Sequence, residues 1–212
     1  VRATDAAGNV DASPASRTWT VDPLVLSDGF ESGQFVSTWS VHTAVGGTAT
    51  VQSSVVRTGA FAARIVAPSS TTYAYARAQL SSSQPNVTVS GDFDITSEGA
   101  SGQEVPIFKL YDASGTRLVY VSRRNSSGRI YVNHGGTNFP ASVKLPLGTW
   151  AHFSVHVIAG GTGSTIEVMM NGGVIYRTVT ASLGTSGVRT IQIGNDRQLP
   201  FGLYADNILV RI

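Results

Sequence analysis

The carboxylates are the first side chains to examine for chemistry, because cleavage of a glycosidic bond usually needs two of them facing one groove. The chain has 13 Asp and Glu residues. Asp92 and Asp94 form a close pair that a strand would present on one face. This pair lies beside a turn and lacks a third acidic partner. The acids therefore do not predict a hydrolase.

A second set of side chains could bind a sugar chain, because aromatic rings stack on sugar C–H faces while amides, Arg and Lys reach hydroxyls. These side chains alternate with small or apolar residues, so period 2 places them together on one open sheet face. They are Tyr73, Tyr75, Arg77, Lys109, Tyr111, Tyr120, Arg124, Tyr131, Asn133 and His134. The alternative interpretation is that solvent-facing tyrosines are ordinary in strands.

Part of this set could also catalyse elimination from a uronate sugar. Tyr131 and His134 would move the proton, and Arg123 or Arg124 would neutralise the carboxylate. The four histidines show no metal-binding spacing, and His152 and His156 are expected to be structural.

The elements that must position these side chains are predicted to be strands, separated by Gly-, Asn- and Pro-containing turns. An opening strand lies within 24–33, and no helical periodicity of useful length competes. The other predicted strands are 48–53, 61–66, 72–80, 87–95, 104–112, 117–124, 129–133, 150–158, 165–170, 174–180, 190–193 and 202–212. This pattern predicts an all-β fold, an antiparallel two-sheet β-sandwich. Asn171-Gly172 predicts a type I′ hairpin, and Trp150 is expected in the core.

Composition excludes several classes of protein. The formal net charge is +2, and no Lys/Arg cluster exists beyond Arg123-Arg124, so nucleic-acid binding has no electrostatic footprint. The chain has no cysteine, which excludes disulfides and thiol catalysis. No apolar run approaches the roughly 18 residues of a membrane helix, which indicates no membrane insertion.

Residues 1–22 differ from the rest of the chain. They read as two short strands around a turn at 5–9, with the second strand ending in Arg17–Val21 and containing Trp19. The run from Val1 to Asp22 resembles the last two strands of bacterial Ig-like domains. We therefore expect 1–22 to be a remnant of such a domain or a linker, and 23–212 to be a second domain.

Residues 23–212 carry several motifs in the order found in jelly rolls. They are Ser27–Gly33 followed by Trp39, Arg57–Arg64, Leu147–Phe153, Met170–Gly173, Ile193–Asn195 and Tyr204–Val210. Together they resemble the concanavalin A-like and laminin-G-like jelly-roll domains of bacterial extracellular proteins. The resemblance implies a concanavalin A-like jelly roll in which the first and last strands lie side by side.

The resemblance also implies a structural Ca²⁺ site. Asp28, Glu31 and Asp206, with backbone carbonyls, would supply the oxygen ligands that calcium prefers. The alternative is that Asp28 caps a turn and Asp206 is an ordinary exposed strand residue.

These observations favour a non-catalytic module that binds a polysaccharide or cell-surface glycan, in a secreted or cell-surface protein with neighbouring domains in the same chain. One alternative is a structural spacer or protein-interaction domain. Another is a polysaccharide lyase or glycoside hydrolase, because fold alone does not fix function.

Overall fold

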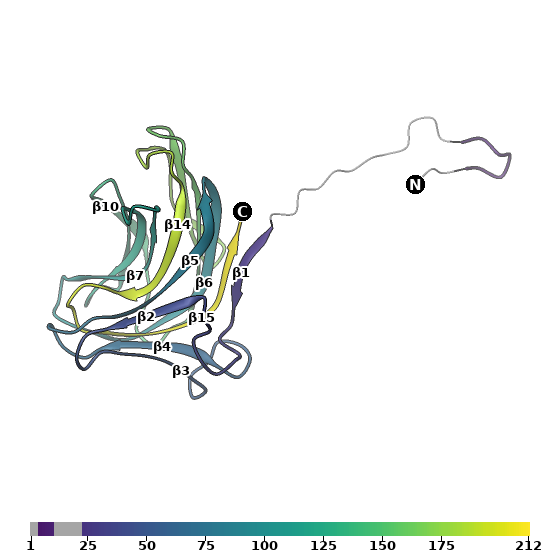
Figure 1. Ribbon diagram of the computed structural model, residues 1–212. Coiled ribbons are helices and arrows are strands. Elements are labelled where there is room, and N and C mark those ends of the chain that lie inside the picture. The colour runs from purple at the N-terminus through teal and green to yellow at the C-terminus, as the bar shows by residue number, and fades with distance from the viewer. Residues whose placement is uncertain (1–3, 11–22) are drawn as a thin grey trace.

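The computed structural model describes residues 4–10 and 23–212 (Figure 1). In the first range, Thr4 and Val10 form an isolated antiparallel bridge around a turn. The Asp5 carboxylate accepts hydrogen bonds from the backbone N–H groups of Ala7 and Asn9, both at 2.9 Å, which closes the turn predicted at 5–9. The predictions for Arg17–Val21 and Trp19 lie outside the described residues.

Residues 23–212 form two antiparallel sheets, as predicted, and the fold is a jelly-roll β-sandwich. The larger sheet runs in the order β13-β12-β11-β6-β15-β4-β3, and β1 also pairs with β15. Its strands are β1 (Leu24–Asp28), β3 (Thr48–Gln52), β4 (Ala62–Ala67), β6 (Asn86–Glu98), β11 (Ala151–Ile158), β12 (Ser164–Met170), β13 (Gly173–Ala181) and β15 (Phe201–Arg211).

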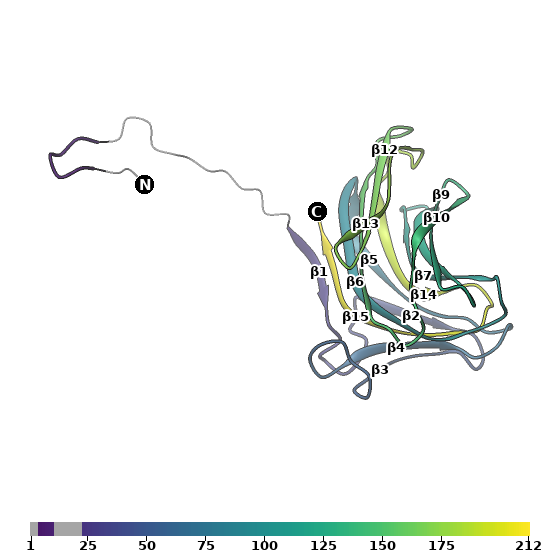
Figure 2. The same cartoon turned by 180° about the vertical axis from the view of Figure 1, so that it is seen from behind.

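The smaller sheet has seven strands in the order β10-β9-β8-β7-β14-β5-β2, and Figure 2 shows both sheets from behind. Its strands are β2 (Trp39–Thr43), β5 (Ala74–Gln84), β7 (Glu104–Tyr111), β8 (Arg117–Arg124), β9 (Arg129–His134), β10 (Thr137–Lys144) and β14 (Val188–Asn195). No helix long and apolar enough to span a membrane occurs among the described residues.

The hydrophobic core lies between the sheets and has an aromatic centre. Phe108 of β7 stacks on Phe93 of β6, with ring centroids 5.4 Å apart, and Phe153 of β11 packs edge-on against both rings. All three rings are buried. Because side chains alternate between the two faces of a strand, this core fixes which residues point outward.

Two local predictions are confirmed. Asn171 and Gly172 both have positive φ, 50° and 81°, and connect β12 to β13 as a type I′ turn requires. β1 pairs with β15, with Asp28 opposite Ile208, so the first and last strands of the sandwich are neighbours. Beyond β1, the Ile212 N–H donates a hydrogen bond of 3.0 Å to the Pro23 carbonyl.

The expectation for Trp150 is wrong. In β11, Ala151, Phe153, Val155 and Val157 are buried, so the alternate positions point away from the core. Trp150 immediately precedes this strand, is only half-buried and contacts the ring of Tyr204. Its apolar character indicated burial, but the parity of the strand places it outside.

Candidate functional site

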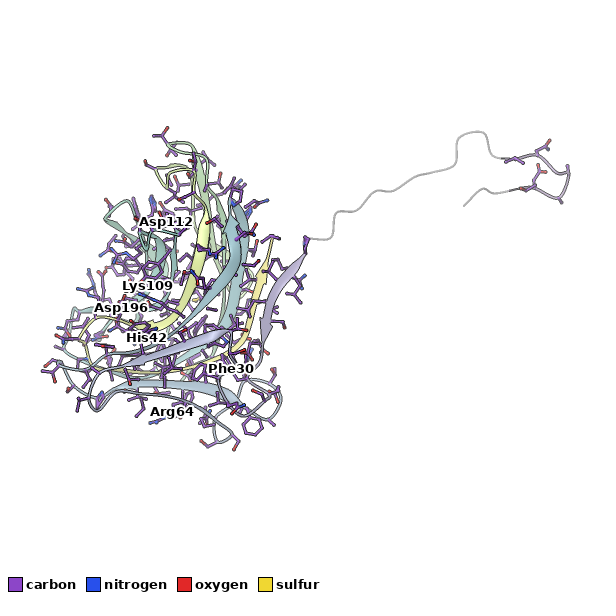
Figure 3. All side chains as sticks on the ribbon, in the orientation of Figure 1. Phe30, His42, Arg64, Lys109, Asp112 and Asp196 are labelled. Atoms are coloured by element: carbon purple, nitrogen blue, oxygen red, sulfur yellow. The ribbon has the colours of Figure 1, made fainter. Side chains whose placement is uncertain are left out.

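The candidate site is the face of the seven-stranded sheet that points away from the eight-stranded sheet, which we call the open face. Alternation in β5 creates it, because Ala74, Ala76 and Ala78 enter the core while Tyr75 and Arg77 point outward. Figure 3 labels His42, Lys109 and Asp196, which belong to the seven-stranded sheet or directly follow one of its strands, and Arg64, which lies on β4 of the other sheet.

A polar cluster joins three central strands of this face. The Lys109 ammonium pairs with the Asp196 carboxylate directly after β14. The Tyr111 hydroxyl lies 3.0 Å from Asp196 Oδ2 and 3.1 Å from Gln192 Oε1, so its one proton is shared between these two acceptors. Arg77 Nε donates to the same Gln192 oxygen at 2.9 Å. The cluster therefore locks each of these side chains in one position.

Burial dominates the electrostatics of the cluster. Lys109 is 1% exposed, and burial lowers its pKa although Asp196 opposes this shift. Burial also raises the pKa of the Tyr111 hydroxyl, and the Asp196 charge adds to that shift. Burial raises the pKa of Asp196 itself, but Lys109, Tyr111 and Arg77 outweigh it, so its pKa is lowered. Asp196 is thus held as a carboxylate between cations.

A second polar group covers the β8–β10 side of the open face. The Arg124 guanidinium lies 4.4 Å from the centre of the Tyr131 ring and pairs with Glu104 at 2.6 Å. Asn138 donates to the other Glu104 oxygen at 2.5 Å, and its own Oδ1 accepts from Asn133 at 2.5 Å. Tyr120 donates to the same Asn138 oxygen at 3.2 Å.

The open face carries more cations than acids. Among the described residues, at least five basic side chains lie on it or contact it, and two carboxylates oppose them. The bases are Arg77, Lys109, Arg117, Arg124 and Arg197, and the acids are Glu104 and Asp196. Arg124 Nε is a buried donor on the open face that lacks a hydrogen-bond partner among the described residues. Such a donor suits a ligand that brings acceptor oxygens.

Two cavities flank the central cluster. One, of about 210 Å³, is lined by Ser40, His42, Arg77, Gln79 and Thr190 on β2, β5 and β14. The other, of about 270 Å³, is lined by Gly102, Gln103, Glu104, Asn138, Arg197 and Leu199. A ligand that reached both cavities would cross the strands over Lys109 and Tyr111.

The predicted binding residues separate into three groups. Tyr75, Arg77 and Arg124 are partly exposed on the open face. Tyr73 directly precedes β5, and its ring centroid lies 5.8 Å from that of Tyr75. Five others are buried and form the floor of the open face rather than its contact surface. They are Lys109, Tyr111, Tyr120, Tyr131 and Asn133.

His134 does not join the others. It shares the parity of the core residues Ile130 and Val132, so it points toward the other sheet. There it stacks on Phe139, with centroids 4.6 Å apart, and its Nε2 lies 2.6 Å from the Tyr176 hydroxyl of β13. Burial lowers its pKa. His134 therefore connects the two sheets.

The residues that the sequence suggested for elimination from a uronate sugar do not lie together either. Tyr131 and Arg124 lie together, but His134 is on the opposite face of β9. Arg123 is buried, pairs with Glu98 and donates from Nε to the Leu145 carbonyl at 2.7 Å. It therefore faces away from Tyr131.

Sequence reasoning missed several open-face residues. The His42 ring stacks on Tyr75 at 4.8 Å, on a strand that was not predicted. Gln192 and Asp196 organise the central cluster, and Glu104 organises the other group. Gln192 alternates with the buried residues Ile191 and Ile193, which is the one signal that could have indicated its position.

The predicted calcium ligands separate in the structure. Asp28 accepts hydrogen bonds from the Trp39 indole N–H and the Phe30 backbone N–H, both at 2.7 Å, which is a capping role. Glu31 and Asp206 converge on Gly29, because a Cβ placed there would lie 3.8 Å from Glu31 Cγ and from Asp206 Oδ1. The described residues contain no group of three His, Cys, Asp or Glu side chains that could hold a metal ion.

Asp206 fits a cation site in part. It is fully buried and not exposed as the alternative interpretation held, and its Oδ2 accepts from the backbone N–H groups of Arg57 (3.0 Å) and Thr58 (3.1 Å). Burial nevertheless raises its pKa. The Asp206 carboxylate and the Asn207 amide oxygen, 3.7 Å from the same Cβ position, lie near Gly29, whereas the Glu31 carboxylate accepts hydrogen bonds from the backbone N–H groups of Ala60 (2.9 Å) and Phe61 (3.4 Å). These oxygens suit Ca²⁺ as a partial set to which backbone carbonyls would be added.

The fold thus defines an antiparallel jelly-roll sandwich, with a cationic and aromatic surface on one sheet. Among solved structures, the chain is similar to the cellulose-induced protein Cip1, with 18% identity, a TM-score of 0.69 and coverage of 87% of this chain and 96% of that one. It is also similar to an endo-β-1,4-glucuronan lyase from the fungus Trichoderma reesei, with 12% identity, a TM-score of 0.65 and coverage of 84% and 93%.

A conserved carbohydrate esterase from the Shiga toxin-encoding bacteriophage phi24B is similar as well, with 14% identity, a TM-score of 0.67 and coverage of 91% and 99%. At these identities the likeness shows the fold. No family model matches the chain, and no curated protein sequence matches it either.

Proposed function

We propose that the open face binds an acidic polysaccharide whose sugars carry carboxylates, without cleaving it. The excess of basic over acidic side chains on the open face is the observation that carries this proposal. Arg77 is the best-placed contact, because it is partly exposed and lines the cavity of about 210 Å³. A carboxylate there would gain a charge-assisted hydrogen bond.

Aromatic rings beside the cations support the same proposal. The Arg77 guanidinium lies 4.8 Å from the centroids of both Tyr75 and Tyr111. The Tyr75 ring and the His42 ring stacked on it offer a surface for the C–H face of a sugar. Proteins related to carbohydrates share this fold, and one of them is a glucuronan lyase, which supports a carbohydrate-related function in general.

Calorimetric titration with glucuronan and alginate oligosaccharides tests the proposal, with cello-oligosaccharides as neutral probes. Arg77→Ala is expected to weaken uronate binding about tenfold or more, because a charged hydrogen bond is lost. Arg177→Ala removes the same charge from β13 on the other sheet and should leave binding unchanged. Equal binding of neutral and acidic probes, or an Arg77→Ala variant with full affinity, would refute the acidic-ligand proposal.

Elimination of the bound uronate is a second candidate function, favoured by the position of His42 beside Arg77 in one cavity. An imidazole there could take the proton next to a carboxylate that Arg77 neutralises, while the C–O bond to the leaving sugar breaks and the leaving oxygen takes a proton from water. Lys109 and Tyr111 are poorer bases, because both are buried and tied to Asp196. Unsaturated sugar ends absorb ultraviolet light, so their appearance would identify a lyase, and their loss in His42→Gln would identify its base.

A further inference from the structure

A row of side chains crosses the outer face of the eight-stranded sheet, on the side of the molecule opposite the open face. Strand register places Arg64 of β4 beside Tyr204 of β15, and Tyr204 beside Asp94 of β6. Ala151 of β11 pairs with Phe93, so Trp150 falls next to Asp94. We call Arg64, Tyr204, Asp94 and Trp150 the outer row.

The two aromatic residues of the outer row face one another across β6. The Trp150 and Tyr204 ring centroids are 6.5 Å apart, with an interplanar angle of 35°. Both side chains are half-buried, so part of each ring reaches solvent. Indole and phenol rings that expose part of a face are the side chains on which sugar rings stack.

Asp94 supplies the observation that points to a ligand. The residue is 4% exposed, and its Oδ1 is buried without a hydrogen-bond partner among the described residues. A buried carboxylate oxygen without a donor is uncommon in folded proteins and costs free energy until a donor reaches it. No basic side chain within ion-pair distance of Asp94 is found in the described part of the chain.

Charges near the outer row indicate what kind of ligand would supply that donor. Arg64 ends the row and is exposed. In the adjacent row, Asp92 lies 3.9 Å from Arg57 Nε and 3.3 Å from His152 Nδ1. Two carboxylates, Asp92 and Asp94, are thus balanced by two guanidiniums, so the surface does not attract a strongly charged ligand as the open face does.

We propose that the outer row is a second glycan-binding site and that it takes a neutral sugar residue. The C–H face of the sugar stacks on Trp150 and Tyr204, a hydroxyl donates to Asp94 Oδ1, and Arg64 donates to a further sugar oxygen. Because Oδ1 is buried, the hydroxyl reaches it only when the surrounding side chains shift, and the Trp150 ring reports that movement through its fluorescence. The domain then holds acidic glycan on one sheet and neutral glycan on the other.

The test titrates the full 212-residue chain with cellohexaose, xylohexaose and mannohexaose, by calorimetry and by tryptophan fluorescence. At least one of these probes is expected to bind and to change the fluorescence. Trp150→Ala should weaken binding about tenfold and abolish the fluorescence change, since a stacking ring is lost. Arg64 is exposed, so Arg64→Ala should leave the fold intact. This variant should weaken binding about threefold.

Two matched variants separate the two faces. Arg177→Ala, on β13 of the same sheet but outside the outer row, should keep full affinity for the neutral probe. Arg77→Ala should also keep it, whether or not the open face binds uronates. Thermal unfolding checks that each variant is folded. The proposal is overturned if no neutral probe binds, if binding survives both Trp150→Ala and Arg64→Ala, or if Arg77→Ala abolishes it.

Discussion

Lys109 and Asp196 form an ion pair in which one partner is sealed and the other reaches solvent. The Lys109 side chain is 1% exposed, whereas the Asp196 side chain is 25% exposed. The pair joins β7 to the residue that follows β14 and sits in the centre of the open face. Removing only the carboxylate therefore leaves a buried charge without compensation.

Asp196→Asn is consequently expected to destabilise the protein by about 3 kcal/mol, the usual cost of breaking a buried pair from one side. Adding Lys109→Met should recover most of that loss, because the double variant no longer buries an unpaired charge. Urea unfolding of the two single variants and the double variant measures this coupling. Additive effects would mean that the two side chains do not depend on one another.

Calcium should raise the melting temperature if Glu31 and Asp206 hold the ion, which is our proposal for this cluster. The cation would relieve the cost of keeping Asp206 ionised while buried. The measurement is a thermal melt with Ca²⁺ and again after chelation. Glu31→Gln should abolish the response, whereas Glu167→Gln, on β12 beside Arg177, should retain it. Identical melting with and without calcium would exclude the ion from this cluster.

Acid should weaken the connection between the sheets at His134. Burial lowers the pKa of this imidazole below its ordinary 6.5, so the unfolded chain binds a proton more readily than the folded one. The neutral His134 imidazole contributes its full stability above pH 6.5, and this contribution is lost as the pH falls from 6.5 toward the lowered pKa of the folded protein. His134→Gln should flatten this part of the pH profile of the melting temperature. His156→Gln, on the outer face of the other sheet, is the control, and an unchanged profile for His134→Gln would contradict the assignment.

The hairpin at Asn171-Gly172 allows a test of backbone conformation alone. Gly172 has φ 81°, where an added Cβ would meet no atom within 4 Å, so its replacement costs only backbone strain. Gly172→Ala should therefore lose about 1 kcal/mol, or about 3 °C in melting temperature for a domain of this size. Gly173→Ala is matched in size and lacks positive φ, so a larger loss there would contradict this explanation.

The sequence predicted every strand of the eight-stranded sheet, including its edges β3 and β13, but missed both edges of the seven-stranded sheet. The predicted strands at 117–124 and 129–133 agree with β8 and β9 to within a residue. The two strands that sequence reasoning missed, β2 and β10, are the edges of the seven-stranded sheet. Edge strands pair on one side only, so they tolerate short length and Pro, and β10 contains Pro140. Their alternation signal is correspondingly weak.

The candidate site shows the same limit. Alternation placed Tyr75, Arg77 and Tyr111 correctly on one face, because local parity decides where they point. Alternation within one strand cannot predict partners from distant segments. Gln192 and Asp196 come close to Arg77 and Lys109 only because β14 pairs with β5 and β7. His134 was placed on the wrong face because its type suggested a binding role, although its parity with Ile130 indicated the core.

The pairing of β1 with β15 has a mechanical consequence. Pro23 and Ile212 are joined by one hydrogen bond, and Leu24 pairs with Arg211 in the next position. A force that pulled residues 23 and 212 apart would load these hydrogen bonds one after another, as in a zipper, and would not shear them all at once. The β1 strand should therefore peel away at low force, while the aromatic core around Phe93 stays closed. Under tension the domain would lengthen by a short, reversible step before it unfolds.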